Sequence, residues 1–286
     1  MNYNNSLDLE DDMMKNSKKL AALALSLSMA VSLAACSNNA NAPGSAENNQ
    51  AADIVYAVEA GSAGEAIAKE NGYTYNSVSS QADALMEVAS GTSDVAIIDL
   101  LMAGAMIGEG TSYPDLTYTE RLTEEKYGVG CRQGSDLTDY INSVFAEAYA
   151  DGTMASLADT YAISQDVLVE QGKAEDFTPT EDGDVAYIQD KGTLIVGITE
   201  FAPMDYKDEN GAWIGFDADL AKLVAEKLGV EAQFVVIDWD NKIMELNSKN
   251  IDVVWNGMTL TDEVTSSMNC TNAYCKNAQV VVTTAQ

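Results

Sequence analysis

From residue 53 onward, short apolar runs alternate with segments in which apolar residues recur every three or four positions. Runs rich in strand-forming residues, most of them apolar, predict strands at Ile54–Val58, Thr74–Val78, Asp94–Ile98, Leu194–Ile198, Gln233–Ile237 and Ile251–Trp255. The segments between them predict helices; in one of these, Phe216, Leu220 and Val224 share a face and Gly229 follows the end. Two β-α-β-α-β halves result. Such halves fold as parallel sheets with helix crossovers, so the predicted fold class is α/β.

Two segments repeat the same order of features. SGTSDVAIID (Ser90–Asp99) and SKNIDVVWNG (Ser248–Gly257) each contain a helix end, a two-residue turn, an Asp and a buried strand. Between the halves, Leu137–Tyr149 and Met154–Ala162 are predicted helices, and the polar stretch Ser164–Asp184 is predicted to be a surface connection.

The first residues combine three lysines with the apolar run Leu20–Ala35. As a helix, this run would span roughly 24 Å, which is short for a bilayer core. A positive start, a short apolar stretch and small residues are typical of an export signal. The run ends at LAAC, which resembles a bacterial lipobox, so residues 1–35 are predicted to be a lipoprotein signal peptide and Cys36 the lipid attachment site. A buried core helix followed by a chance cysteine is the alternative.

Residues 36–52 are small and polar. They cannot bury enough apolar surface to fold, so they are predicted to form a disordered tether that holds a domain off the membrane. The remaining chain is long enough for two small lobes or one large domain.

The chain is strongly acidic, with 45 Asp and Glu against 15 Lys and Arg and a formal net charge of −30. Removing residues 1–35 takes away four acids and three lysines, which leaves 41 against 12. Nucleic acid and anionic lipid headgroups are therefore poor partners, and membrane contact is expected through the lipid anchor only. The sequence has no His, which removes the commonest general base and zinc ligand. We expect no catalytic residue, no metal and no cofactor.

Cys270 and Cys275 lie close together in a chain predicted to be exported, where a disulfide can persist. Their spacing does not fix the separation of their Cα atoms, so a bridge and two free thiols both stay open. Cys131 has no obvious partner. Two thiols without His or further Cys fall short of the four ligands of a structural zinc site.

The longest motifs are GTLIVGITEFAPMDYKDENGAWIGFDADLAKLVAEKLG (Gly192–Gly229) and WDNKIMELNSKNIDVVWNGMTLTDE (Trp239–Glu263). They resemble the first lobe of the extracellular solute-binding proteins of polar amino-acid ABC transporters, with its aromatic-Pro loop and "GFD" turn. VEAGSAGE (Val58–Glu65) and Ser90–Asp99 resemble the second lobe, and KYGVGCRQGSD (Lys126–Asp136) resembles the segment that returns to the first lobe. The resemblance implies a two-lobed, periplasmic-binding-protein-like fold of type II, each lobe a mainly parallel sheet with flanking helices.

The order of these motifs differs from that of the family. In the family the opening lobe comes first, the chain crosses to the second lobe and then returns. Here residues 53–125 resemble the second lobe, and residues 126–286 contain the returning segment, the first lobe and, at AQVVVTTAQ, the first crossing strand. A circularly permuted order is therefore expected. Two gene fragments joined by accident are the alternative, but the two pieces make one complete fold with nothing duplicated.

The resemblance also implies ligand-binding residues at the carboxyl ends of strands, which face the space between the lobes. Phe201 matches the family's aromatic residue that covers the ligand, and Trp239 is the candidate for the opposite wall. Both could instead be packing residues. Asn256, Gly257 and Thr259 match positions where the family offers backbone and hydroxyl groups to a ligand.

Charged groups of the ligand would be bound in the other half of the chain. Ser62 and Ala63 open a helix, where free N–H groups and the helix dipole favour an anionic group. Asp99 matches the family's acceptor for the ligand's α-ammonium, with a helix cap as the alternative. Val264 stands where the family has a carboxylate-binding Arg. Either backbone amides hold the carboxylate alone, or the ligand is not a standard α-amino acid.

These features together predict an exported, monomeric substrate-binding component of an ABC importer, anchored through Cys36 to the outer face of the cytoplasmic membrane. It would bind a small polar ligand, an amino acid or a related compound, and deliver it to the permease subunits. Presentation of the ligand to a sensory membrane receptor is the alternative. A dehydratase-like enzyme on the same fold is disfavoured, because such chemistry needs a positioned acid or base pair.

Overall fold

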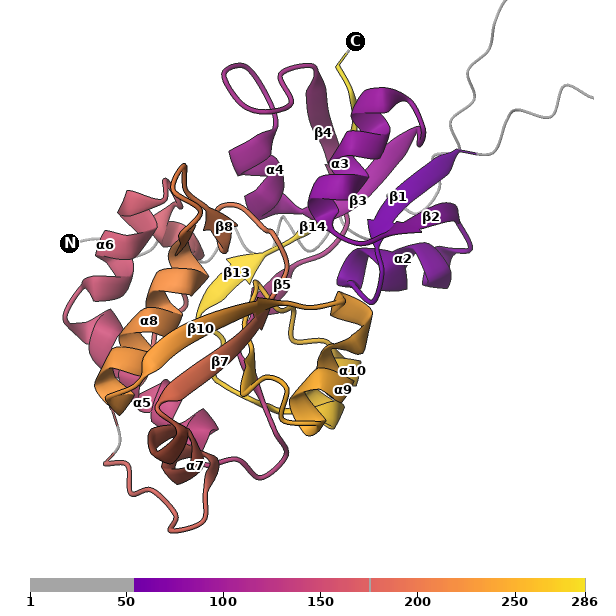
Figure 1. Ribbon diagram of the computed structural model, residues 1–286. Helices are drawn as coiled ribbons and strands as arrows, with labels where there is room; N and C mark the ends of the chain where they lie inside the picture. The colour runs from indigo at the N-terminus through magenta and orange to yellow at the C-terminus, as the bar shows by residue number, and fades with distance from the viewer. Residues whose placement is uncertain (1–53, 175, 286) are drawn as a thin grey trace, which may run out of the picture. The chain divides into compact units, whose positions relative to one another are not determined.

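A computed structural model describes residues 54–174 and 176–285, all within one structural unit (Figure 1). The predicted signal peptide at 1–35, the lipid attachment at Cys36 and the tether at 36–52 lie outside these residues. No helix in 54–174 or 176–285 has the length and apolar character needed to cross a bilayer.

The first half of the chain builds a five-stranded sheet in the order β2-β1-β3-β14-β4. Its strands are β1 (Val55–Glu59), β2 (Thr74–Val78), β3 (Val95–Asp99), β4 (Leu116–Arg121) and β14 (Gln279–Thr284). The helices α2 (Ala63–Asn71), α3 (Gln81–Ser90) and α4 (Leu100–Met106) connect them. β1 is parallel to β2 and β3, whereas β14 is antiparallel to both β3 and β4. We call this sheet and its three helices lobe A.

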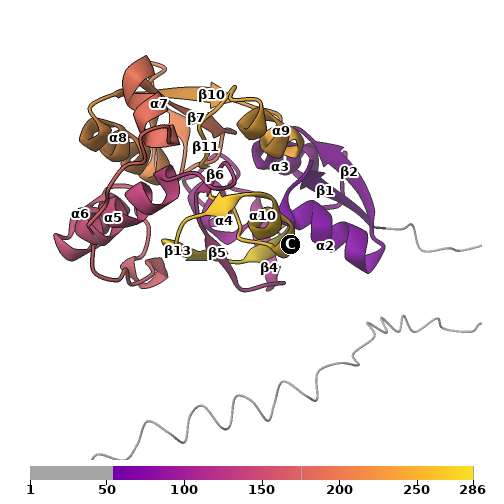
Figure 2. The ribbon, with the colours of Figure 1, turned by 90° about the horizontal axis from the view of Figure 1, so that it is seen from below.

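The second half builds another five-stranded sheet in the order β10-β7-β11-β6-β12. Its strands are β6 (Gly130–Cys131), β7 (Thr193–Ile198), β10 (Glu231–Val236), β11 (Val253–Val254) and β12 (Asn269–Cys270). Its helices are α5 (Leu137–Ala150), α6 (Thr153–Thr160), α7 (Asp184–Lys191), α8 (Phe216–Leu228), α9 (Lys242–Asn247) and α10 (Asp262–Ser267). We call this part lobe B. Helices α5, α6 and α8 gather on one side of its sheet, and α9 and α10 lie on the other (Figures 1 and 2).

The two lobes share one topology. In each sheet the fourth strand alone runs against its neighbours, so each sheet is mainly parallel. The predicted α/β class, with two lobes built on mainly parallel sheets, is confirmed.

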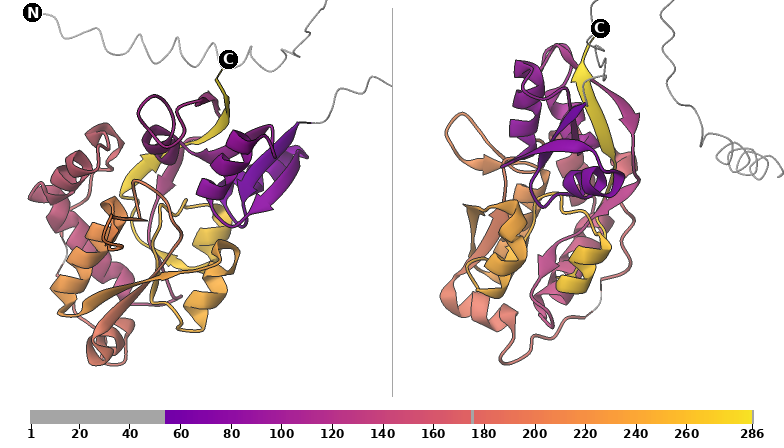
Figure 3. Two further views of the ribbon diagram at one scale, coloured as in Figure 1. Left: turned by 45° about the horizontal axis from the view of Figure 1, so that its top comes forward. Right: turned by 90° about the vertical axis from the view of Figure 1, so that its right-hand side faces the viewer.

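The reversed strand of each sheet lies where the chain crosses from one lobe to the other. β14 lies at the end of the sequence yet joins lobe A, where Figure 3 shows it in yellow among purple strands. β6 follows the lobe A strands in sequence yet joins lobe B. The two crossing segments also pair with each other, because β5 (Glu125–Tyr127) is antiparallel to β13 (Cys275–Asn277). A two-stranded ribbon therefore connects the lobes.

The strand and helix boundaries depart from the sequence prediction where packing overrides local pattern. The run at 251–255 is apolar and buried, but only Val253–Val254 pairs as a strand. β4 was not predicted, since it is an edge strand with mostly exposed, polar side chains. The predicted connection at 164–184 holds one short 3₁₀ turn, Gln165–Val167, before α7 begins.

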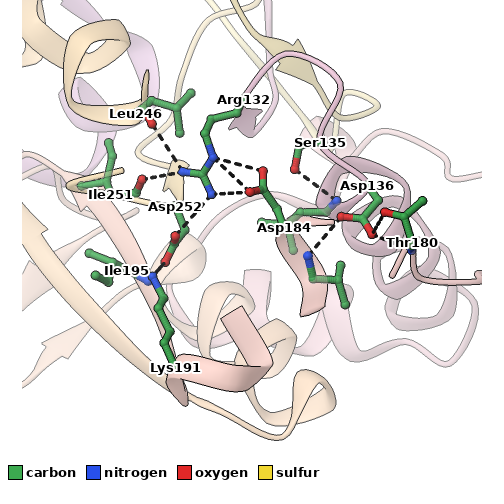
Figure 4. A network of polar contacts seen from close by, with 12 residues as sticks. Arg132, Ser135, Asp136, Thr180, Asp184, Lys191, Ile195, Leu246, Ile251 and Asp252 are labelled. Atoms are coloured by element: carbon green, nitrogen blue, oxygen red, sulfur yellow. Dashed lines mark hydrogen bonds and ion pairs between the residues drawn. The ribbon is translucent and has the colours of Figure 1, made fainter. Parts of the chain in front are cut away.

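A buried network of charges ties the returning segment to the rest of lobe B (Figure 4). Arg132 donates to Asp184 Oδ1 at 2.9 Å and to the carbonyl oxygen of Ile251 at 2.9 Å. Asp252, which is fully buried, is paired with both Arg132 and Lys191. Residues from the β6 end, from α7 and from β11 therefore depend on one guanidinium.

Replacing Arg132 by Met should lower the free energy of unfolding by about 3 kcal/mol, because the half-buried Asp184 and the fully buried Asp252 lose their shared partner. Urea unfolding followed by circular dichroism measures this loss. The control is Lys227→Met, which breaks the exposed Lys227–Glu147 pair and should cost less than about 1 kcal/mol. Equal losses in the two variants would contradict the role given to Arg132.

Candidate functional site

The carboxyl ends of strands from both lobes meet at a cavity of about 240 Å³. This volume lies just below the roughly 300 Å³ at which pockets for drug-sized ligands begin, so the cavity suits a small molecule. The structure brings all eight predicted ligand-binding residues to it: Ser62, Ala63 and Asp99 from lobe A, and Phe201, Trp239, Asn256, Gly257 and Thr259 from lobe B. Residues far apart in the sequence thus share one site.

Two aromatic residues of lobe B form walls of the cavity. Phe201, just after β7, is 2% exposed and meets the edge of Tyr127 at a ring-centroid distance of 6.4 Å. Gly257 allows this position, since a Cβ there would lie 2.4 Å from Phe201 Cε1 and its φ is +55°. Trp239 is 7% exposed and lies under the ammonium of Lys242, 5.1 Å from the ring centroid.

Asn256 and Gly257 line the cavity while their polar groups bind the protein itself. Asn256 Oδ1 accepts from the Thr199 N–H at 2.9 Å, and Asn256 Nδ2 donates to Asp205 Oδ2 at 2.8 Å. The N–H of Gly257 donates to Asp217 Oδ2 at 2.7 Å. Both residues therefore position the loop after β11, and the N–H that the resemblance assigned to the ligand is already in use.

Thr259 and Ser62 have hydroxyl groups that also bond within the protein. Thr259 Oγ1 donates to Glu125 Oε2 at 3.1 Å, and Ser62 Oγ accepts from the Glu65 N–H at 3.1 Å as the cap of α2. Ala63 is the first residue of α2, so the helix N-terminus points at the cavity that Ser62 and Ala63 line.

Asp99 is a buried carboxylate with many donors around it. It is 4% exposed and accepts from Tyr127 Oη at 2.6 Å, from Gln279 Nε2 at 3.1 Å, and from the side-chain amides of Gln81 and Asn277. Although Asp99 directly precedes α4, its side chain makes no capping bond within the described chain, so the capping alternative is wrong. Burial, aided by the charge of Glu125, raises the pKa of Asp99 to about 7.

Glu59 is a cavity residue that the sequence prediction missed. It ends β1, beside Asp99 at the end of the neighbouring parallel strand β3, and is 3% exposed. Its Oε1 finds no hydrogen-bond partner among the described residues. Burial and then the charge of Asp99 raise its pKa to about 8. A charged residue that ends an otherwise apolar strand was the available signal.

Lys242 was also missed and is the one basic residue among the described residues that line the cavity. It is 7% exposed, and its Nζ donates to the carbonyl oxygens of Gly61 at 2.9 Å and Trp239 at 3.2 Å. Burial lowers its pKa. Because Gly61 belongs to lobe A and Lys242 to lobe B, this bond joins the lobes directly. Val264 lines the cavity as well, and an Arg is absent from that position.

Cys270 and Cys275 are free thiols in the structure, so the bridge considered from the sequence is not formed. Each lies in a different strand pair, Cys270 in β12 beside β6 and Cys275 in β13 beside β5. Cys131 is also free and is fully buried. Across 54–174 and 176–285, no cluster of three or more acidic, Cys or His side chains is placed to hold a metal ion.

One segment of the chain matches a known protein family. Residues 194–286 match the family "Bacterial extracellular solute-binding proteins, family 3". The resemblance predicted from the sequence is thereby confirmed for this segment. By its description, the family acts outside the cytoplasm.

Individual relatives match over a similar part of the chain. The L-cystine-binding protein TcyJ of Escherichia coli K12 is 36% identical over 84 residues, 29% of this chain and 32% of that protein. The arginine-binding extracellular protein ArtP of Bacillus subtilis is 33% identical over 93 residues, 32% of this chain and 36% of that protein. A solved ancestral cationic amino acid solute-binding protein is 41% identical over 29% of this chain and 37% of that one, with a TM-score of 0.29. The chain spans about a third of the length of the curated relatives it matches.

The buried acids should make stability depend on pH. The pKa of Glu59 rises from 4.5 to about 8 on folding, so between these values the unfolded chain loses a proton that the folded protein keeps. This contribution to stability is complete below about pH 4.5 and is lost as the pH rises towards 8. Glu59→Gln should flatten the fall of the unfolding free energy between pH 5 and 8 by up to about 1.4 kcal/mol per pH unit.

Urea unfolding at a series of pH values measures this slope. The matched control is Glu70→Gln, which changes an exposed Glu at the far end of α2 and should keep the slope of the unaltered protein. Parallel curves for Glu59→Gln and the control would show that Glu59 does not carry the pH dependence.

Proposed function

We propose that this protein is a solute-binding protein that holds a small polar ligand between its lobes and performs no chemistry on it. The observation that carries the proposal is the convergence of eight residues from both lobes on one cavity at the carboxyl ends of the strands. Ligands of open α/β sheets bind at such strand ends. The family match of residues 194–286 supports the same function.

The cavity offers complementary groups for an amino acid or a related compound. Asp99 would accept an ammonium group through Oδ2, which accepts from only one side chain among the described residues, that of Gln81. The N-terminus of α2 at Ser62 and Ala63 would attract an anionic group. Phe201 and Trp239 would enclose the apolar part of the ligand. Relatives named for binding cystine and arginine support a ligand of this class.

Ligand release would require the lobes to move about the β5–β13 ribbon. Such motion would break the hydrogen bond from Lys242 to the Gly61 carbonyl oxygen and every ligand contact that is shared between the lobes.

The closed form would dock as a monomer on the permease subunits of an ABC importer. The lipobox-like segment ending at Cys36 supports anchoring to the outer face of the cytoplasmic membrane. Presentation to a sensory receptor is the alternative, and neighbouring genes for a permease and an ATPase would discriminate.

The chain order is proposed to be a circular permutation of the family's order. Support comes from lobe A, because the sheet built by residues 55–121 is completed by β14 (Gln279–Thr284), which follows all of the lobe B strands in the sequence. A variant that joins Gln286 to Asp53 through a Gly/Ser linker, and opens the chain between Lys173 and Ala174, would restore the family's order. Cooperative folding of that variant with the original ligand affinity is expected, and failure to fold would contradict the permutation.

A thermal-shift screen of small polar metabolites, followed by calorimetry, should find a ligand that binds with one-to-one stoichiometry. Asp99→Asn should weaken that binding at least tenfold, because it removes the charge from a charge-assisted hydrogen bond. Asp190→Asn, an exposed acid on α7, is the control and should bind normally.

Mass spectrometry of the bound ligand should recover it unchanged. Full affinity in Asp99→Asn would remove Asp99 from the site, and a converted product would contradict a pure binding function.

A further inference from the structure

The charges that line the cavity are unbalanced. Glu59, Asp99, Asp262 and Glu263 face a single base, Lys242. That ammonium already donates to the carbonyl oxygens of Gly61 and Trp239. Its charge lowers the pKa of Glu59 by less than burial and the charge of Asp99 raise it. The described cavity is therefore short of positive charge.

The two buried carboxylates differ in their free acceptor capacity. Asp99 receives four side-chain donors, three of them on Oδ1 and one on Oδ2, so Oδ1 is fully used and Oδ2 keeps one of its two lone-pair sites for a ligand. Glu59 Oε1 receives none from the described residues, although the side chain is 3% exposed. The nearby side chains of Thr199 and Gln81 lower the pKa of Glu59, but by less than burial and the charge of Asp99 raise it. A buried, unsatisfied carboxylate oxygen costs free energy, so native proteins retain such groups where a function uses them.

The fold also places these carboxylates together. β1 and β3 are parallel neighbours, with Ala57 opposite Ala96, and Glu59 and Asp99 end these strands. Asp99 and Glu59 each line the cavity, and the charge of Asp99 acts on Glu59. Two acceptors for cationic groups thus lie at one edge of the lobe A sheet.

We infer that Glu59 is a second ligand-binding carboxylate, and that the ligand carries two cationic nitrogen groups, one bound by Asp99 and one by Glu59. This inference rests on the proposed function and narrows its ligand class to dibasic amino acids or aliphatic diamines. The Val264 position fits an aliphatic diamine, which has no carboxylate for an Arg to bind, and the carboxylate of a dibasic amino acid would be left to the N-terminus of α2.

Binding of such a ligand has a proton balance. In the free protein at pH 7, Glu59 is mostly a neutral carboxylic acid, because its pKa is about 8. An ammonium placed against Oε1 favours the carboxylate, so the carboxyl O–H gives its proton to the solvent as the ion pair forms. The charged groups around Glu59 are Asp99 on β3, Lys242 on α9, and Asp262 and Glu263 on α10.

Four matched probes test the second cationic group by calorimetry: L-lysine with L-norleucine, and cadaverine with pentylamine. Within each pair the molecules differ by one terminal ammonium. That ammonium should raise affinity for the unaltered protein tenfold to a hundredfold, as expected for a hydrogen bond between charged groups. Glu59→Gln should abolish this gain, whereas Glu70→Gln should keep it. The pair that binds more tightly tells whether the ligand carries a carboxylate.

Repeating the titrations at pH 7 in phosphate and in Tris, which differ in ionisation enthalpy, measures proton release. The dibasic probe should release about one proton more from the unaltered protein than from Glu59→Gln. Because the probe pairs are compared on the unaltered protein, the test stands even where the variant does not fold.

The outcomes separate the inference from the proposed function. Equal affinities within both probe pairs would overturn the two-cation inference while leaving a binding protein. A loss of affinity for both members of a pair in a Glu59→Gln protein that unfolds as cooperatively as the unaltered protein would also overturn it, since Glu59 would then hold the only ammonium. Binding of no small polar metabolite at all would contradict the proposed function itself.

Discussion

Asp99 is the point at which the architecture and the cavity meet. Its buried carboxylate accepts from Tyr127 on β5, Asn277 on β13 and Gln279 on β14, and thereby holds both crossing segments against lobe A. The same side chain lines the cavity between the lobes. Any charge placed near Asp99 therefore acts on the ribbon about which the lobes would move. If the ligand binds at Asp99 as proposed, binding and hinge position would share one electrostatic group.

Several buried acids whose burial is unfavourable for their charged form lie around the cavity. Behind the loop after β11, Asp205 and Asp217 are fully buried. Burial raises the pKa of Asp217 to about 7, and burial together with the charge of Asp217 raises the pKa of Asp205 well above its usual range. Tyr274 and the Gly257 N–H stabilise Asp217. Elsewhere in the described chain, the buried acid Asp252 has basic partners. Concentrated departures from charge balance are typical of functional sites.

The sequence predicted the fold well because the governing signals were local. In the buried parallel strand β3, the four residues 95–98 are all apolar, and the helix Phe216–Leu228 has a clear apolar face and a terminal glycine. Edge and crossing strands are different. β4 is polar and β12 is short. β4 pairs with β14 and β12 pairs with β6, and in both pairs the two strands are more than 100 residues apart in the sequence. Only the resemblance identified the crossing segments near Tyr127 and Gln279.

The cavity was predicted in position but not in its charges. Matching motifs assigned Phe201, Asp99 and Thr259, and the structure brings them together. Glu59 and Lys242 were missed because each lies within an ordinary strand or helix pattern, and their importance comes from burial that only the assembled lobes create. The same holds for Asn256 and Gly257, whose bonds to Asp205 and Asp217 cannot be read from a linear sequence.

The central claim is that both lobes hold one ligand, and hydrogen exchange with mass spectrometry tests it most directly. The amides of residues 59–66 in lobe A and of residues 256–264 in lobe B should gain protection together, at the same concentration of the ligand found by screening. The exposed amides of α7 serve as the internal reference and should not change. Protection of one lobe segment without the other would contradict a ligand trapped between two lobes.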